Sequence, residues 1–227
     1  MSRGMSAGMS RGRSRIRSSP PGIVLGQLLI FLFPLSCAHT VKENLDVLSQ
    51  AKSTECPSEL DKLDDSKALM LPPNEWVEGE LREGRCTSAV SRRSSWEIFR
   101  FMPNDTRADL EVRTRMNGQG LSLQGEPSMI IPYVTTLEGM RRASGSVRLL
   151  SIRTERDPAK GDALVYRFSM TGLKPGKKTG VLITADLGQA GKKLEHAIFD
   201  HFTGEFPFPA NLLVGPFGPF EIRLDRP

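Results

Sequence analysis

A strict alternation of side chains in the second half of the sequence constrains the fold more than any other feature. Over residues 164–170 the sequence reads LVYRFSM, and Leu164, Tyr166, Phe168 and Met170 stand at every second position. Successive side chains of a strand point to opposite faces, so this spacing predicts a β-strand with one apolar face. Such strands must bury that face against another layer, which favours a sandwich or a barrel.

Other segments repeat this pattern between turn residues. Strands are predicted at residues 96–101, 109–116, 121–123, 129–134, 146–154, 164–170, 181–185 and 220–224. We expect the first of these to return through a Pro-Asn-Asp turn into the second, and a hairpin at Asn117-Gly118. A further hairpin joins the strands on either side of the turn at residues 157–161. The sequence therefore predicts an all-β fold, an antiparallel, Greek-key-like β-sandwich over residues 76–227.

The N-terminus has the composition of an export signal. Residues 1–22 are rich in Arg, Ser and Gly, and residues 23–35 are apolar apart from Gly26, Gln27 and Pro34. As a helix, an apolar stretch of this length reaches about 20 Å, short of the roughly 30 Å hydrocarbon core of a bilayer. A basic flank, a short apolar stretch and small residues after it are typical of a secretory signal.

Residues 35–38, LSCA, resemble the lipobox of bacterial lipoproteins, in which a small residue precedes the cysteine that receives the lipid. The resemblance implies that residues 1–37 hold a signal peptide and that Cys37 becomes a lipid anchor. Because Ala38 follows the cysteine in place of Asp, it also implies the outer membrane, facing the periplasm or the cell surface. Pro34 departs from the family, which has an aliphatic residue there. An ordinary signal peptide or an uncleaved anchor is the alternative.

The number of cysteines supports this interpretation. The sequence has three, Cys37, Cys56 and Cys86, and an odd cysteine in an exported protein requires an explanation. If Cys37 carries lipid, Cys56 and Cys86 are left to form a disulfide. By restricting the unfolded chain, such a bridge should stabilise the folded state by about 3.5 kcal/mol. Two unpaired thiols are the alternative. Neither cysteine lies in a C-x-x-C motif, so no redox or zinc site is expected.

The charge distribution argues against a nucleic-acid partner. The sequence has 31 basic and 26 acidic residues, a formal net charge of +5. Five arginines and no acidic residue lie within residues 1–37, so the remainder has 26 residues of each sign. A protein that binds nucleic acid needs a net positive face to displace counterions from the phosphates. We expect a solvated surface of balanced charge instead.

Residues 38–75 have the pattern of a polar linker with short helices. Val41, Leu45 and Leu48 recur at helical spacing, and residues 58–61, SELD, resemble a capping box. Helices this short are not stable alone. They either lie on the sandwich or stay mobile.

A short segment is similar to two sandwich families. Residues 172–185 read GLKPGKKTGVLITA, which resembles a turn and strand of Cu/Zn superoxide dismutase and also of fibronectin type III. In the dismutase the copper-binding histidines fall at positions that are Leu182 and Thr184 here, and neither binds a metal. The fibronectin tyrosine falls at Thr179 or Gly180. Both resemblances imply a Greek-key sandwich. The resemblance to the dismutase does not include its copper ligands, so it argues against dismutase chemistry.

No catalytic, cofactor or metal site is expected from the remaining motifs. The histidines are His39, His196 and His201, and the last two do not share a helical face. Ser49-x-x-Lys52 and the K-T-G of residues 178–180 resemble motifs of penicillin-binding enzymes, but no S-D-N lies between them.

The C-terminal region is rich in phenylalanine and proline. Its phenylalanines are Phe199, Phe202, Phe206, Phe208, Phe217 and Phe220. Either they form a flap that packs on the sandwich, or they expose an aromatic surface for a hydrophobic ligand or an envelope protein. Asn104 begins a glycosylation sequon in a predicted turn, which matters only in a eukaryotic secretory pathway.

The sequence predicts an exported, lipid-anchored envelope lipoprotein with a non-catalytic binding or structural β-sandwich. The alternative is an exported enzyme, a hydrolase or a degenerate dismutase-like protein, with a site not visible in the sequence. An enzyme should show a deep pocket that holds two or more titratable groups, and a binding module a flat or grooved apolar patch.

Overall fold

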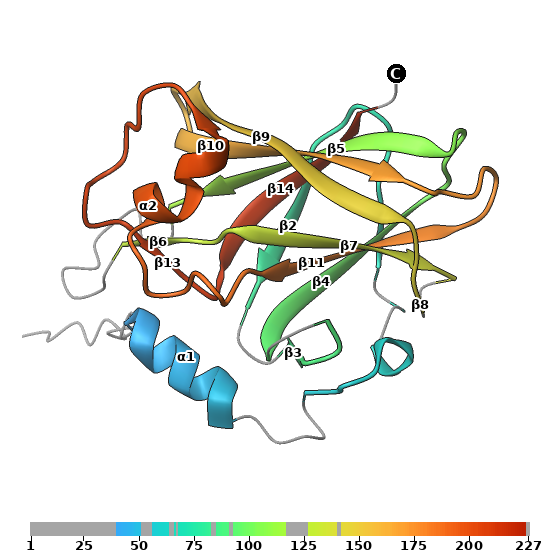
Figure 1. The fold of residues 1–227 in the computed structure, drawn as a ribbon, viewed down its shortest axis with the longest axis horizontal. Helices are drawn as coiled ribbons and strands as arrows, with labels where there is room; N and C mark the ends of the chain where they lie inside the picture. The colour runs from blue at the N-terminus through green and yellow to red at the C-terminus, as the bar shows by residue number, and fades with distance from the viewer. Residues whose placement is uncertain are drawn as a thin grey trace, which may run out of the picture. The chain divides into compact units, whose positions relative to one another are not determined.

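The computed structural model describes residues 40–50, 56–63, 66, 68–82, 85–90, 93–116, 127–139 and 142–225. All of them belong to the unit Cys37–Pro227. Two sheets of six strands each form a β-sandwich, and a two-stranded sheet lies beside them (Figure 1). The predicted fold class is therefore confirmed.

The first sheet, sheet A, has the strand order β1-β4-β11-β7-β8, with β3 paired to β4. Its strands are β1 (Leu69–Met70), β3 (Cys86–Thr87), β4 (Ser94–Phe101), β7 (Pro132–Glu138), β8 (Arg142–Ala143) and β11 (Thr179–Ala185). The long pairs are antiparallel, and the short β1 is parallel to β4. All seven residues of β11 are buried, as expected for a central strand covered on both faces.

The second sheet, sheet B, has the strand order β12-β9-β10-β5-β14-β2. Its strands are β2 (Val77–Leu81), β5 (Arg107–Arg115), β9 (Ser146–Asp157), β10 (Gly161–Thr171), β12 (Phe202–Thr203) and β14 (Gly218–Asp225). The predicted hairpin on either side of residues 157–161 is confirmed as β9–β10. The short β12 runs parallel to β9, so this sheet is also mixed.

The remaining elements are short. The strands β6 (Ser128–Met129) and β13 (Leu213–Val214) form the small parallel sheet. The helices are α1 (Val41–Gln50) and α2 (Leu194–Ile198), and the 3-10 turns are η1 (Leu60–Lys62) and η2 (Phe199–His201). The predicted strand at residues 129–134 is thus split between β6 and β7.

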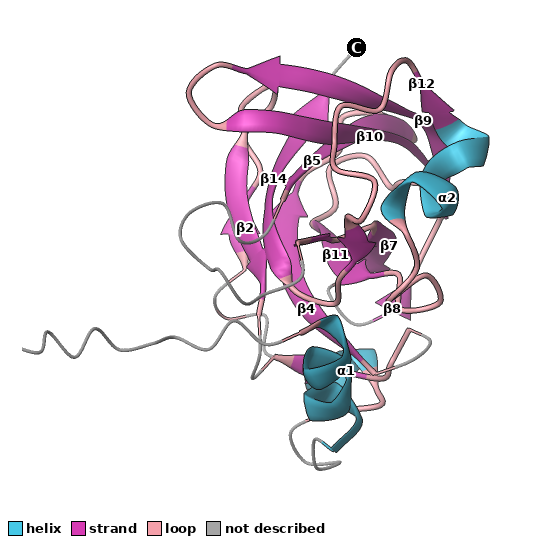
Figure 2. Cartoon of the chain, turned by 90° about the vertical axis from the view of Figure 1, so that its left-hand side faces the viewer, coloured by secondary structure: helices cyan, strands magenta, loops and turns pink. Residues whose placement is uncertain are grey.

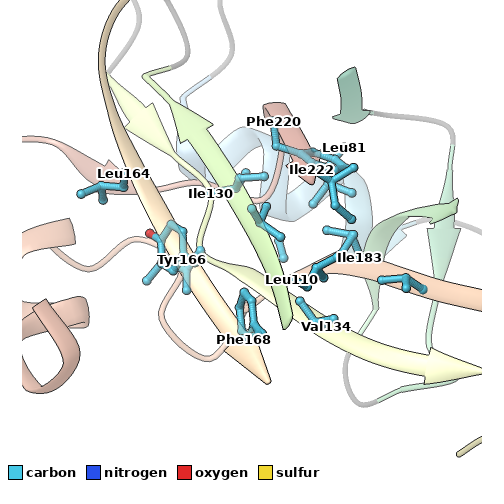
Figure 3. Packing of buried hydrophobic residues seen from close by; sticks show 14 of the residues in the cluster. Leu81, Leu110, Ile130, Val134, Leu164, Tyr166, Phe168, Ile183, Phe220 and Ile222 are labelled. Atoms are coloured by element: carbon cyan, nitrogen blue, oxygen red, sulfur yellow. The ribbon is translucent and has the colours of Figure 1, made fainter. Parts of the chain in front are cut away.

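The main core fills the space between the two sheets (Figure 3). Tyr166 and Leu164 of β10, Leu110 of β5 and Ile183 of β11 are all fully buried there. They come from the apolar positions of the alternating strands, as the period of two predicted. Phe99 and Phe220 meet across the sheets edge to face, with ring centroids 5.8 Å apart.

One predicted pairing is wrong. Residues 96–101 and 109–116 do form strands, observed as β4 and β5, but they belong to different sheets. β4 pairs with β11, and β5 pairs with β10 and β14. Both strands have apolar side chains that face the main core, so the chain crosses between the sheets after Phe101 instead of folding back beside β4. The predicted Asn117-Gly118 hairpin and the strand at 121–123 lie outside the described residues.

The segment before the sandwich packs on it. Leu63 packs with Trp96, Ile98, Leu137 and Leu182, which form an apolar patch on the outer face of sheet A. The partly buried Leu60 and Ala68 also pack against this patch. Leu60, Leu63 and Ala68 therefore cover part of the outer face of sheet A.

The predicted capping box at residues 58–61 is not observed. The 3-10 turn η1 begins after Glu59, without a side-chain hydrogen bond to its first turn. A capping box instead begins α1, where Thr40 and Glu43 bond each other's backbone N–H groups. The sequence pattern T-x-x-E at this place could have revealed it.

Candidate functional site

A cleft of about 670 Å³ opens where β2, the edge strand of sheet B, approaches β1 and β4 of sheet A. Leu69, Pro219 and Phe220 form the apolar part of its wall, and four acidic and four basic side chains form the charged part. This volume lies in the range of small-molecule binding sites. The cleft is therefore large enough to hold a small-molecule ligand.

A glycine makes one side of this cleft. A Cβ atom at Gly79 would lie 2.5 Å from the ring of Phe220 and 2.9 Å from the ring of Phe99. Real Cβ atoms do not approach other heavy atoms this closely, so any side chain here would displace the two rings. The phenylalanine pair of the core can reach β2 only because residue 79 is a glycine.

The charged wall arises from the alternation of β5 and β14. In β5, Leu110, Val112 and Thr114 are fully buried, and Arg113 and Arg115 lie on the opposite, outer face of sheet B. Glu221 of β14 lies directly opposite Arg113 in the antiparallel register. The turn between β9 and β10 then supplies Lys160. The strand period and the pairing together place these four charges beside one another.

Glu221 is the centre of this cluster. Its carboxylate accepts hydrogen bonds from Lys160 Nζ and Arg113 Nη1, both at 2.8 Å, and from Arg115 Nη2 at 3.2 Å. Burial raises the pKa of Glu221, but the hydrogen bonds from Lys160 and Arg113 and the charge of Arg115 outweigh it and lower the pKa to about 2. The hydrogen bond to Glu221 likewise raises the pKa of Lys160.

The ion pairs continue across the outer face of sheet B. Glu111 accepts hydrogen bonds from Arg153 Nη1 at 2.8 Å and from Arg223 Nη2 at 2.6 Å. The ring of Trp76 lies against two guanidinium groups, with 3.9 Å from its centroid to Arg113 and 4.7 Å to Arg223. Stacking of this kind is a cation–π interaction that also shields the charges from water. We call this surface the charged ladder, after Trp76, Glu111, Arg113, Arg115, Arg153, Lys160, Glu221 and Arg223.

The electrostatics of the cleft suit stability and recognition better than proton transfer. A general acid or base works best with a pKa near the operating pH. Mutual pairing shifts the pKa values of Glu221 and Lys160 away from neutrality, in opposite directions. Each group therefore keeps its charge at neutral pH. The cleft holds more than two titratable groups, as an active site would. Glu221 and Lys160, however, form an ion pair with each other.

The sequence did not identify the charged ladder, although it contained a signal for it. Residues 107–115 read RADLEVRTR, in which charged residues alternate with apolar or small ones. This pattern predicts a strand with a charged outer face. It does not say which charges on β9, β14 and the β9–β10 turn meet that face, because those contacts depend on strand pairing.

The structure brings together one predicted pair. Cys56 and Cys86 form a disulfide, with Cα atoms 4.5 Å apart. Both cysteines are buried and pack with Leu48 of α1 and Phe217. The bridge therefore fastens the segment before the sandwich to β3. Cys37, the predicted lipidation site, lies outside the described residues.

The structure describes two of the three histidines. His196 and His201 are both exposed, on α2 and η2. Within the part of the chain that the structure describes, no three His, Cys, Asp or Glu side chains cluster as a metal site would require. His39 lies outside that part.

The other candidate motifs lie in ordinary surroundings. Ser49 is exposed on α1, and its Oγ donates a hydrogen bond to the backbone carbonyl of Asp46 at 2.7 Å. Lys52 lies outside the described residues. Of the positions aligned with dismutase ligands, Leu182 packs in the apolar patch of sheet A and Thr184 is buried in β11. Asn104 is exposed in the turn before β5.

The phenylalanine-rich region is mostly packed. Phe217 and Phe220 are buried, and Phe202, Phe206 and Phe208 pack against the main core as partly buried rings. Neighbouring rings of the last three meet edge to face, at 5.9 and 5.3 Å. Phe199 differs from them, with 76% of its surface exposed. The flap therefore accounts for five phenylalanines and leaves Phe199 as the candidate contact residue.

Comparison with protein families, curated proteins and solved structures gives no significant match to this chain. Among the described residues, no helix has both the length and the apolar character that a membrane crossing needs.

Proposed function

We propose that this protein is an exported lipoprotein, anchored in the bacterial outer membrane through Cys37, whose β-sandwich binds a partner or supports the envelope without catalysis. The disulfide between Cys56 and Cys86 carries the proposal. It uses two of the three cysteines and leaves Cys37, directly after the apolar stretch, as the remaining thiol. A lipid on Cys37 explains why the number of cysteines is odd.

The disulfide also supports export. Disulfides form and persist in oxidising compartments such as the periplasm and are rare in the cytosol. Cys56 and Cys86 are both almost completely buried beneath Leu48 and Phe217, so the bridge belongs to the packed structure. A domain that relies on such a bridge is suited to the compartment that an export signal would reach.

The contact surface in this proposal is the exposed end of the phenylalanine-rich region. Phe199 lies in η2, next to β12, which pairs with β9 at the edge of sheet B. A large and mostly exposed aromatic side chain costs solubility, and such residues often anchor a protein partner or a hydrophobic ligand. The neighbouring phenylalanines hold its segment on the core.

The experiment is the intact mass of the protein purified from the membrane fraction of a bacterial host, beside a Cys37→Ser variant. We expect the wild type to begin at Cys37 and to carry acyl chains that the variant lacks. A Cys56→Ser/Cys86→Ser variant is the matched control, because it loses two other thiols and should keep the lipid. Cleavage without acylation, or no cleavage, would show that the proposal is wrong.

A further inference from the structure

The first described residues fix where the chain joins the sandwich. Thr40 precedes α1, and its backbone N–H donates to Glu43 Oε2 at 2.6 Å. The N–H of Glu43 donates in return to Thr40 Oγ1 at 3.2 Å, and Asn44 N–H donates to the Thr40 carbonyl at 3.0 Å. These bonds satisfy donors at the start of the helix. The capping box therefore marks the start of α1 at Thr40.

The helix that begins there is held against the domain. Val41 and Leu48 are 3% and 4% exposed, and Leu48 packs with Cys56, Cys86 and Phe217. Arg93 Nη1 also donates to the carbonyl of Ser49 at 2.6 Å. The disulfide fastens the chain again a few residues after the helix. As a result α1 belongs to the folded domain and is not a free tether.

The number of residues between the proposed anchor and this helix limits the distance to the membrane. Three peptide units connect Cys37 to Thr40. Even fully extended they span at most about 11 Å. A flexible linker over all of residues 38–75 would instead average roughly 35 Å from end to end. The shorter distance is too small for the domain to turn freely above a bilayer.

We propose, resting on the lipid anchor at Cys37, that the side of the sandwich that carries α1 lies at the lipid headgroups. The charged ladder and the β9–β10 hairpin then face the aqueous compartment. Figures 1 and 2 both show α1 on the side of β4, with β9 and β10 at the opposite side of the sandwich. The exposed face of α1 includes Lys42, Glu43 and Asp46, so the helix meets headgroups and does not insert among the acyl chains.

This orientation also assigns the kind of partner that Phe199 can reach. Phe199 is next to β12, which pairs with β9. Figure 2 shows β12 and β9 on the side of the sandwich away from α1. An exposed phenylalanine near a bilayer could insert into it, but here the anchor holds the opposite side of the domain at the membrane. Phe199 is therefore available to a partner in the aqueous compartment.

The two tryptophans report on the two sides of the domain. Trp96 lies on the side that carries α1. It follows Ser95, which pairs with Cys86, and Cys86 packs against Leu48 of α1. Trp76 lies on the charged ladder, over Arg113 and Arg223. The variants Trp76→Phe and Trp96→Phe each keep one of these reporters. Acylated protein, verified by mass, is reconstituted into phosphatidylcholine vesicles that contain dansyl-labelled phosphatidylethanolamine, and energy transfer to the dansyl group is measured.

We expect greater transfer from Trp96 than from Trp76. In the Trp76→Phe variant, twenty Gly and Ser residues are inserted between His39 and Thr40. This insertion should reduce the transfer from Trp96, because the longer tether lets the domain move away from the bilayer. Acylated protein with equal transfer from both tryptophans, or with more from Trp76, would overturn the orientation alone. A protein that carries no lipid would overturn the proposed function, and the orientation with it.

Discussion

The two sheets of the sandwich share one core but have opposite outer faces. The outer face of sheet A is apolar, and Leu63 from the N-terminal segment packs on Trp96, Ile98 and Leu182. The outer face of sheet B is the charged ladder, in which the largely buried side chains of Arg113 and Glu221 pair with each other. The first face needs a cover, because exposed apolar area of that size is unfavourable. The second satisfies its own charges and needs none.

This difference explains why the N-terminal segment is part of the domain. Without Leu60, Leu63 and Ala68, sheet A would expose a continuous apolar patch, and the disulfide fastens the chain just before them. Sheet B is fixed mainly by pairing between its own strands, with Trp76 laid over its arginines. One face thus depends on chain connectivity, and the other on electrostatics.

The largest expected effect comes from releasing the cover of sheet A. The Cys56→Ser/Cys86→Ser variant should lower the free energy of unfolding by about 3.5 kcal/mol, because the disulfide restrains the unfolded chain. Urea unfolding monitored by circular dichroism measures the change. The reducing agent dithiothreitol should destabilise the wild type equally and leave the double variant unaffected. Unchanged stability of the double variant would show that the bridge does not hold the cover.

The patch beneath the cover gives the next effect. Leu182 of β11 is fully buried and packs against Leu63 of the N-terminal segment, so Leu182→Ala should cost about 3 kcal/mol through lost burial and the cavity left behind. Leu150→Ala is the matched control, because Leu150 is 41% exposed on β9 and should cost less than about 0.5 kcal/mol. Equal costs for the two variants, measured by urea unfolding, would mean that the outer face of sheet A is not a packed layer.

The charged ladder should show its contribution through pH. The pKa of Glu221 is lowered to about 2, so the stability that this carboxylate contributes is present above its unfolded pKa, near 4.5, and is lost as the pH falls toward 2. Glu221→Gln should cost on the order of 2 kcal/mol at neutral pH and make the acid-induced loss of stability shallower. Urea unfolding at a series of pH values tests both. Glu205→Gln, at an exposed position, should change neither; if Glu221→Gln behaves like it, the ladder contributes nothing to stability.

The smallest effect concerns the exposed aromatic residue. Phe199→Ser should change the free energy of unfolding by less than about 0.5 kcal/mol, because Phe199 is mostly exposed. It should reduce the fluorescence of the apolar dye anilinonaphthalene sulfonate bound to the native protein. Phe208→Ser, in the packed part of the same region, should instead be destabilising. A destabilised Phe199→Ser would argue that this residue supports the fold and is not a contact surface.

The sequence by itself determined the local structure. The alternation of Leu164, Tyr166 and Phe168 fixed a strand and its buried face, because the period of a strand depends only on backbone geometry. The odd number of cysteines, with Cys37 assigned to the lipid, also left Cys56 and Cys86 as a pair, and the structure joins them in a disulfide. Three of the eight residues of the charged ladder, Glu111, Arg113 and Arg115, could have been recognised in the same way, from the charge alternation of residues 107–115.

Only the tertiary structure decided which strands are neighbours. β4 and β5 follow each other in the sequence but join different sheets, because both bury apolar side chains in the same core. The meeting of Glu221 with Arg113 and Lys160 joins residues far apart in the sequence. The packing of Leu63 on Leu182 also joins residues far apart in the sequence. Such contacts arise from competition among all the apolar faces of the chain, and no local pattern records its outcome.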